Sequence, residues 1–67
     1  MKKGTLVVVR RPFWHNGKEI GGSLGQVVGT KGYILVDIFE YDYNPVKCFR
    51  NEIEITRFII NISIFKN

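Results

Sequence analysis

Residues 21–38, GGSLGQVVGTKGYILVDI, decide the fold of this chain. The stretch predicts a hairpin in which a strand at residues 25–28 and an apolar strand at residues 33–39 flank a tight turn. Gly29 and Gly32 bound the turn. Because glycine reaches the positive-φ conformations that tight turns require, we expect both glycines to adopt them. The hairpin is an architectural feature and carries no chemistry of its own.

The alternation of apolar residues in this hairpin indicates which side faces the core. Asp37 belongs on the solvent face, and in that register Ile34, Val36 and Ile38 point inward. The first strand then directs Gly25 and Val27 toward the interior. Gly25 is where we expect the closest approach of two backbones.

Length and composition predict one all-β domain. Sixty-seven residues can form a single domain with a small core. A hydrophobic content of 45%, with 13% aromatic residues, is typical of a folded chain. Alanine is absent, whereas Val, Ile, Phe, Tyr and Thr are abundant, and these residues suit pleated strands.

Cysteine usage favours a reducing compartment. Cys48 is the only cysteine and cannot form an intramolecular disulfide, and no second histidine offers a metal-site spacing. A small secreted domain would normally carry disulfides, so we expect a cytoplasmic or other reducing intracellular location. The apolar run that follows Lys3 is too short for a signal peptide or a membrane span, so membrane insertion is not expected.

Further segments complete the predicted fold. A first strand at residues 2–11 turns Val7 and Val9 inward, and Pro12 ends it. A long loop is expected at residues 13–22 (FWHNGKEIGG). The remaining expected elements are a turn at residues 40–45, a short strand at 46–49 with Val46 and Cys48 inward, one helical turn at 50–52, and a core position at Ile53.

The end of the chain reads as a strand with one apolar face. Residues 55–65 (ITRFIINISIF) alternate, and the shared face consists of Phe58, Ile60, Ile62 and Ile64. An exposed apolar strand needs a cover, so we expect this face to contact a partner protein or a second copy of the chain. The chain thus divides into a barrel at residues 1–55 and a C-terminal strand or extension at residues 56–67.

Several segments resemble the SH3-like barrel group. They are KGTLVVV at residues 3–9, LGQV at residues 24–27 and FRNEIE at residues 49–54. The first two are similar to KOW-type domains of ribosomal and transcription-elongation proteins. The third, with Trp14, Asn16 and the segments at 10–12 and 19–21, is similar to electron-transport accessory barrels such as photosystem I subunit IV. The resemblance implies a five-stranded SH3-like barrel with an extra C-terminal strand or tail, and it leaves the branch open.

The first loop and the turn at residues 40–45 carry the candidate binding surface. Its residues are Arg10, Arg11, Trp14, His15, Lys18, Tyr41 and Tyr43. Arginine can pair with phosphate or carboxylate, and tryptophan can stack on a base or fill a partner's pocket. We expect Trp14 to stay exposed and Phe13 to cover the end of the barrel. The tyrosines, with Tyr33, can join an aromatic face or pack on the barrel, and His15 is expected to be a solvent-exposed loop residue.

These features predict a non-enzymatic binding module that docks onto a larger protein or assembly through the first loop and the C-terminal strand. No serine, threonine or cysteine lies beside a plausible base, so we expect neither catalysis nor a cofactor. The alternative is an RNA- or DNA-binding KOW-like domain with one basic side. Its basic residues are Lys2, Lys3, Arg10, Arg11 and Lys18. The acidic segment at residues 37–54 weighs against it, since it would repel phosphate unless it faces away.

Overall fold

The computed structural model describes residues 1–56 of the chain and shows an all-β protein. Its elements are β1 (Leu6–Val9), β2 (Trp14–His15), β3 (Lys18–Glu19), β4 (Leu24–Gly29), β5 (Ile34–Ile38), β6 (Val46–Cys48), the 3-10 turn η1 (Arg50–Glu52) and β7 (Ile53–Ile55). The predicted partner-binding face of Phe58, Ile60, Ile62 and Ile64 lies outside the described residues.

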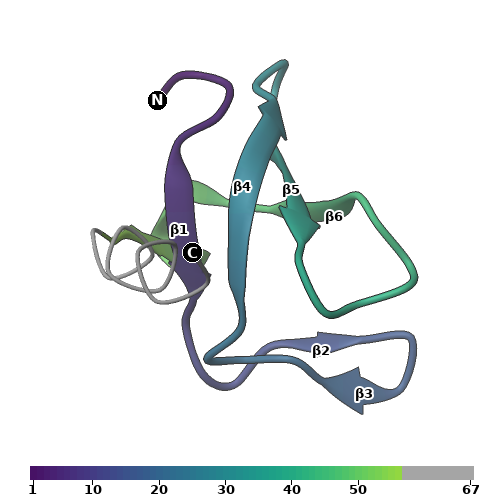
Figure 1. The fold of residues 1–67 in the computed structure, drawn as a ribbon. Helices are drawn as coiled ribbons and strands as arrows, with labels where there is room; N and C mark the ends of the chain where they lie inside the picture. Colours follow the sequence, from purple (N-terminus) through teal and green to yellow (C-terminus); the bar gives the residue numbers. More distant parts are fainter. Residues whose placement is uncertain (57–67) are drawn as a thin grey trace, which may run out of the picture.

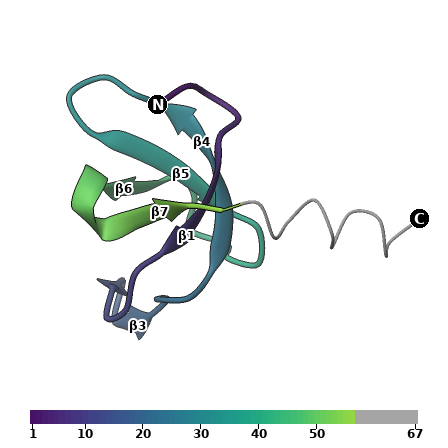
Figure 2. The same ribbon diagram turned by 90° about the vertical axis from the view of Figure 1, so that its left-hand side faces the viewer.

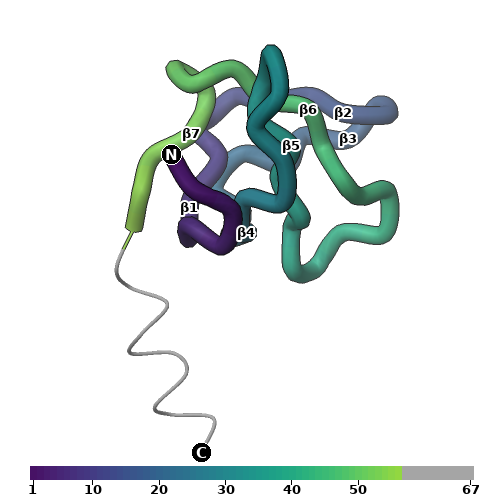
Figure 3. The backbone as a smooth tube through the Cα atoms, turned by 90° about the horizontal axis from the view of Figure 1, so that it is seen from above, coloured from purple at the N-terminus to yellow at the C-terminus, as the bar shows by residue number. Residues whose placement is uncertain are grey.

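Five strands form one antiparallel sheet in the order β6-β5-β4-β1-β7. The sheet curls into a half-barrel: β6 lies to one side of β4 in Figure 1, and the view turned by 90° in Figure 2 shows both edge strands, β6 and β7, on the same face of β4. The turn η1 connects these two edges. Viewed from above, the strands surround a common centre (Figure 3). The predicted all-β class and the predicted helical turn before the last strand are confirmed.

The central hairpin forms in the predicted register. β4 and β5 pair with Gly25 opposite Ile38 and with Val27 opposite Val36. Gly25 is buried, and a Cβ built on it would lie 2.6 Å from the carbonyl oxygen of Asp37. The predicted close approach of two backbones at this glycine is therefore confirmed.

The turn of this hairpin starts later than predicted. Gly32 has a φ of +74°, as expected, but Gly29 does not adopt a positive φ. Gly29 instead remains in β4, where it pairs with Leu35 after a shift in register that follows Val27. The expectation for Gly29 was wrong because the strand accommodates it through a β-bulge, and bulges favour glycine for its lack of a side chain.

The core lies inside the curl and is built almost entirely from alternating strand residues. The buried residues are Val7, Val9, Phe13, Ile20, Val27, Val36, Ile38, Tyr41, Val46, Cys48 and Ile53. The predicted inward positions of β1, β4, β5 and β6 are buried except Ile34, which is partly buried and packs against the core, and Ile53 is fully buried at the start of β7. Burial also raises the pKa of the Cys48 thiol to about 11.

The segment at residues 13–22 is a second, smaller hairpin and not the predicted loop. β2 and β3 pair with Trp14 opposite Glu19 and with His15 opposite Lys18. Asn16 and Gly17 form the connection, with φ angles of 51° and 75°. Two consecutive positive φ values are typical of the two-residue type I′ turn, which Asn-Gly favours. The loop prediction was wrong because the strands are too short to show alternation.

The close approach at Gly25 generates a stability prediction. Gly25→Ala should lower the free energy of unfolding by about 1–3 kcal/mol, because the new Cβ overlaps backbone atoms that cannot rotate away. Gly29→Ala is the matched control, since its Cβ would meet the end of the Leu35 side chain at 3.0 Å, and that end can move. Urea denaturation followed by circular dichroism measures both, and equal losses would contradict the role given to Gly25.

Candidate functional site

The β2–β3 hairpin projects from one end of the half-barrel (Figure 1). Its base is fixed to the sheet, because the N–H of Val9 donates to the carbonyl of Ser23 at 3.0 Å and the N–H of Gly22 donates to the carbonyl of Val9 at 2.7 Å. Phe13 and Ile20 flank the hairpin and are both buried in the core. Phe13 thus covers the end of the barrel, as predicted. The hairpin is a supported element of the fold.

Glu19 fixes the shape of the chain at the base of the hairpin. Its Oε2 accepts hydrogen bonds from the N–H of Phe13 at 2.8 Å and from the N–H of Gly21 at 2.6 Å. These two N–H groups lower the pKa of the Glu19 carboxyl and outweigh the opposing effect of burial, and the nearby charge of Arg11 lowers the pKa by a smaller amount. The ionised carboxylate therefore connects both ends of the hairpin.

Arg11 lies along the two glycines that follow the hairpin. A Cβ built on Gly22 would be 2.7 Å from its Nη2, and a Cβ built on Gly21 would be 2.6 Å from its Cγ. The absence of side chains at these glycines therefore makes room for the arginine. Its guanidinium lies beside Gly22 at the hairpin base, and the residue remains exposed.

His15 connects the hairpin to the loop at residues 39–45. Its Nδ1 lies 2.8 Å from the hydroxyl oxygen of Tyr41, and the same hydroxyl donates to the carbonyl of His15 at 3.0 Å. Because the single hydroxyl hydrogen goes to that carbonyl, Nδ1 must carry the hydrogen in the other bond. The sequence-based expectation of a solvent-exposed loop histidine was wrong, since His15 is half-buried on a strand and bonded to Tyr41.

Asn44 fixes the loop that carries Tyr41. Its Oδ1 accepts from the N–H of Ile38, and its Nδ2 donates to the carbonyls of Ile38 and Tyr41. The Tyr41 ring makes edge-to-face contacts with His15, at 5.5 Å between centroids, and with Tyr43, at 5.6 Å. The structure therefore brings three of the predicted residues, His15, Tyr41 and Tyr43, into one aromatic cluster.

Two large aromatic side chains remain open to solvent at this end. Trp14 is 68% exposed and Tyr43 is 63% exposed, whereas Tyr41 is buried. Trp14 precedes His15 on β2, and successive strand residues point to opposite sides. Trp14 therefore lies on the hairpin face away from the aromatic cluster. Tyr33 lies elsewhere, at the start of β5, with the Nζ of Lys47 4.4 Å from its ring centroid.

The predicted basic side is divided between two ends of the molecule. Lys2 and Lys3 precede β1, and Arg10 and Arg11 follow it. Figure 1 shows the N-terminus at the end opposite the β2–β3 hairpin. Arg10 also forms an ion pair with Glu54, with 3.2 Å between Nη2 and Oε1. The expectation of one basic side was wrong, because the extended strand β1 separates its members.

Among residues 1–56, no three His, Cys, Asp or Glu side chains are grouped so that they could bind a metal ion. The same residues form no helix with the length and apolar content needed to cross a membrane.

Comparison of the chain with protein-family models, with curated proteins and with solved structures found no match. The site is therefore interpreted from its own residues and geometry.

Sequence reasoning missed two residues that hold this end together, Glu19 and Asn44. Asn16-Gly17 was a usable signal for the hairpin, because Asn-Gly is typical of two-residue turns. In such a hairpin, Glu19 lies at the end of the second strand. Its carboxylate is then close enough to accept a hydrogen bond from the N–H of Gly21. Asn44 precedes a proline in a turn, where an asparagine commonly bonds to nearby backbone. Its contact with Ile38, however, depends on the path of the whole loop.

The low pKa of Glu19 predicts an acid-sensitive hairpin. Because folding lowers this pKa, the contribution of Glu19 to stability is fully present above the unfolded value of about 4.3, and it is lost as the pH falls through the folded value. The amide proton shifts of Phe13 and Gly21 should therefore move together below about pH 4.3 in an NMR titration.

Glu19→Gln should remove this shared transition, since a glutamine cannot be protonated in that range. Glu54→Gln is the control, because Glu54 pairs with Arg10 and contacts neither amide. A Phe13 and Gly21 transition that persists in Glu19→Gln would contradict the assignment.

Proposed function

We propose that this protein is a non-enzymatic binding module with an SH3-like barrel, and that it docks onto a larger protein through the β2–β3 hairpin. The observation that carries the proposal is Trp14, which is 68% exposed on a hairpin whose backbone is held in place. A buried tryptophan would be explained by the fold alone. An exposed tryptophan on a hairpin whose backbone is fixed is explained by contact with a partner.

The strand arrangement supports the SH3-like part of the proposal. β1 lies between β4 and the last strand, β7, and a 3-10 turn immediately precedes β7. The connection from β1 to β4 is long and carries the small hairpin. This connectivity is what the resemblance of residues 3–9, 24–27 and 49–54 to SH3-like barrels implies.

The rigidity of the hairpin favours protein binding. A flexible loop loses conformational entropy when a partner fixes it, and this loss weakens the complex. Here Glu19 joins the two ends of the hairpin, and Tyr41 holds His15, before any partner arrives. Tryptophan is also the residue type most enriched among the contacts that dominate protein interfaces. The exposed ring of Trp14 therefore needs little further ordering to act as an anchor.

Nucleic-acid binding receives less support from the geometry. Phosphate contacts gain affinity when several cations follow one backbone. The lysines before β1 and the arginines after it face different ends of the molecule, and the charge of Arg10 is compensated by Glu54. Trp14 therefore has only part of the predicted basic set near it.

Trp14→Ala should weaken partner binding by at least about tenfold while leaving the fold intact, since loss of a central tryptophan costs about 2 kcal/mol or more in such interfaces. Phe49→Ala is the matched control, because Phe49 is 64% exposed and lies outside the hairpin. Proteins crosslinked to the tagged wild type in an extract of its own cells would be purified, and their affinities for all three forms measured by calorimetry. Equal affinities for the two variants would contradict the proposal, as would binding only to RNA or DNA.

The proposed second contact, the C-terminal strand, has its own test. Ile60→Ser should reduce either partner affinity or the molecular mass measured by analytical ultracentrifugation, because Ile60 belongs to the predicted apolar face. Ile59→Ser is the control, since alternation places Ile59 on the other face. The same loss in both variants would show that the residues do not act as a strand with one binding face.

A further inference from the structure

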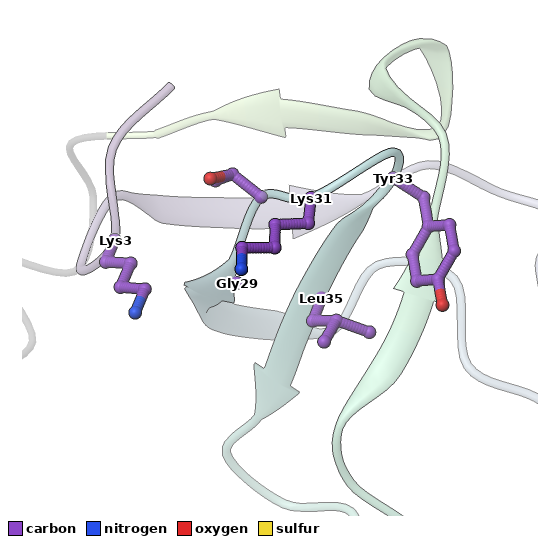
Figure 4. Close-up of a pocket in the computed structure, with 6 residues that line it drawn as sticks. Lys3, Gly29, Lys31, Tyr33 and Leu35 are labelled. Atoms are coloured by element: carbon purple, nitrogen blue, oxygen red, sulfur yellow. The ribbon is translucent and has the colours of Figure 1, made fainter.

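A second candidate site lies at the end of the half-barrel opposite the β2–β3 hairpin. It is a groove between the N-terminal turn and the β4–β5 turn, with a volume of about 280 Å³. Its lining residues are Lys3, Gly29, Thr30, Lys31, Tyr33 and Leu35 (Figure 4). Two of the six are cations, and none is an acid.

The fold itself places Lys3 at this groove. The N–H and the hydroxyl of Thr5 both donate to the carbonyl of Lys2, at 3.1 Å and 2.6 Å, and so close a turn around Lys3. The N–H of Gly4 donates to the carbonyl of Val27 in β4 at 2.6 Å, and Gly4 has a φ of +88°. The turn is thus attached to the strand that leads into the other side of the groove.

Lys31 reaches the same groove from the β4–β5 turn. Figure 4 shows the Lys3 and Lys31 side chains on the same side of Leu35, with the Tyr33 ring on the other side. Lys47 does not line the groove but lies beside it, with its Nζ over the Tyr33 ring. The groove therefore has a cationic part and an apolar, aromatic part.

No carboxylate lines this groove in the part of the chain that the structure describes. The described ion pair joins Arg10 to Glu54, and the carboxylate of Glu19 is bonded at the base of the other hairpin. Residues 57–67 contain no Asp or Glu. Lys3 and Lys31 both line the groove, so an anion bound there would be attracted by both ammonium groups.

We propose that this groove binds a small phosphate ester. A phosphate monoester carries about two negative charges and can face both lysines at once, whereas a carboxylate carries one. The Thr30 hydroxyl can donate to a phosphate oxygen. Leu35 and the Tyr33 ring offer an apolar wall for the organic part of the ester. The volume falls near the lower end of the range for small-molecule sites, so a ligand of mononucleotide size fits it better than a larger one.

This site is separate from the proposed protein-binding hairpin, so each can be tested alone. The full chain, labelled with ¹⁵N, would be titrated with adenosine monophosphate, with adenosine and with inorganic phosphate at about 20 mM and about 0.15 M salt. Adenosine monophosphate should shift the amides of residues 29–33 and of Lys3 in a saturable way. Adenosine should not, and inorganic phosphate should bind about tenfold more weakly than the ester, since it makes no contact with Tyr33.

Substitutions test which side chains contribute to binding of adenosine monophosphate. Lys31→Ala should weaken binding of adenosine monophosphate about tenfold, and Tyr33→Ala should bring its affinity down to that of inorganic phosphate. Lys18→Ala is the matched control, because it removes the same charge from an exposed position at the other end. It should leave the affinity unchanged.

Four results would overturn the proposal. They are the absence of localised shifts, equal losses in Lys31→Ala and Lys18→Ala, equal affinity for the ester and for inorganic phosphate, and much tighter binding of a 5′-phosphorylated oligonucleotide than of the mononucleotide. The second would show attraction to net charge alone. The last would show that the groove is part of a nucleic-acid surface.

Discussion

The contact between the backbones of β4 and β5 at Gly25 is the constraint on which the rest of the structure depends. A side chain at this position would lie 2.6 Å from the Asp37 carbonyl oxygen, so only glycine allows the two strands to close here. The β-bulge after Val27 adds local twist to the same strand pair. Curling lets both edge strands contribute to one core, in which Val46 and Ile53 are fully buried. A flat sheet of this length would leave one of them exposed. In a chain this small, that loss of buried apolar surface would be a large part of the core.

Outside the curled sheet, side-chain hydrogen bonds fix the conformation of the β2–β3 hairpin and of the loop at residues 39–45. Glu19 joins the two ends of the β2–β3 hairpin, and Asn44 makes three bonds across the loop at residues 39–45. Tyr41 then connects these two segments through His15. The bonds of Glu19 and Asn44 all go to backbone N–H and C=O groups, and buried polar groups without partners are costly. The exposed rings of Trp14 and Tyr43 therefore lie on segments that these hydrogen bonds fix, in addition to the pairing of two short strands.

How much the sequence predicts depends on the range of the interactions involved. The core positions of β1, β4, β5 and β6 follow from strict alternation, and Gly25 follows from its place in that pattern. The conformation of Gly29 was predicted wrongly because a bulge and a turn both favour glycine. Which of the two forms at Gly29 depends on its pairing with Leu35. His15 misleads because its partner, Tyr41, is distant in sequence. Of the candidate site, exposure of Trp14 could be anticipated from its polar neighbours and the position of Glu19 from the Asn16-Gly17 turn, but the contact of Asn44 with Ile38 could not.

The distribution of charge shows why linear clustering is a poor guide to surface chemistry in a β protein. Lys3 and Arg10 both belong to the basic N-terminal third of the sequence, yet β1 lies between them, and because an extended strand advances about 3.3 Å per residue it places them at different ends of the half-barrel. At the hairpin end, Glu54 and Glu19 offset Arg10 and Arg11, so these cations mainly orient the chain. Lys3 and Lys31, which are far apart in the sequence, both line the groove, and no carboxylate lines it. The strand that separates the basic residues thus creates two surfaces of different chemistry, and a ligand at one leaves the other open.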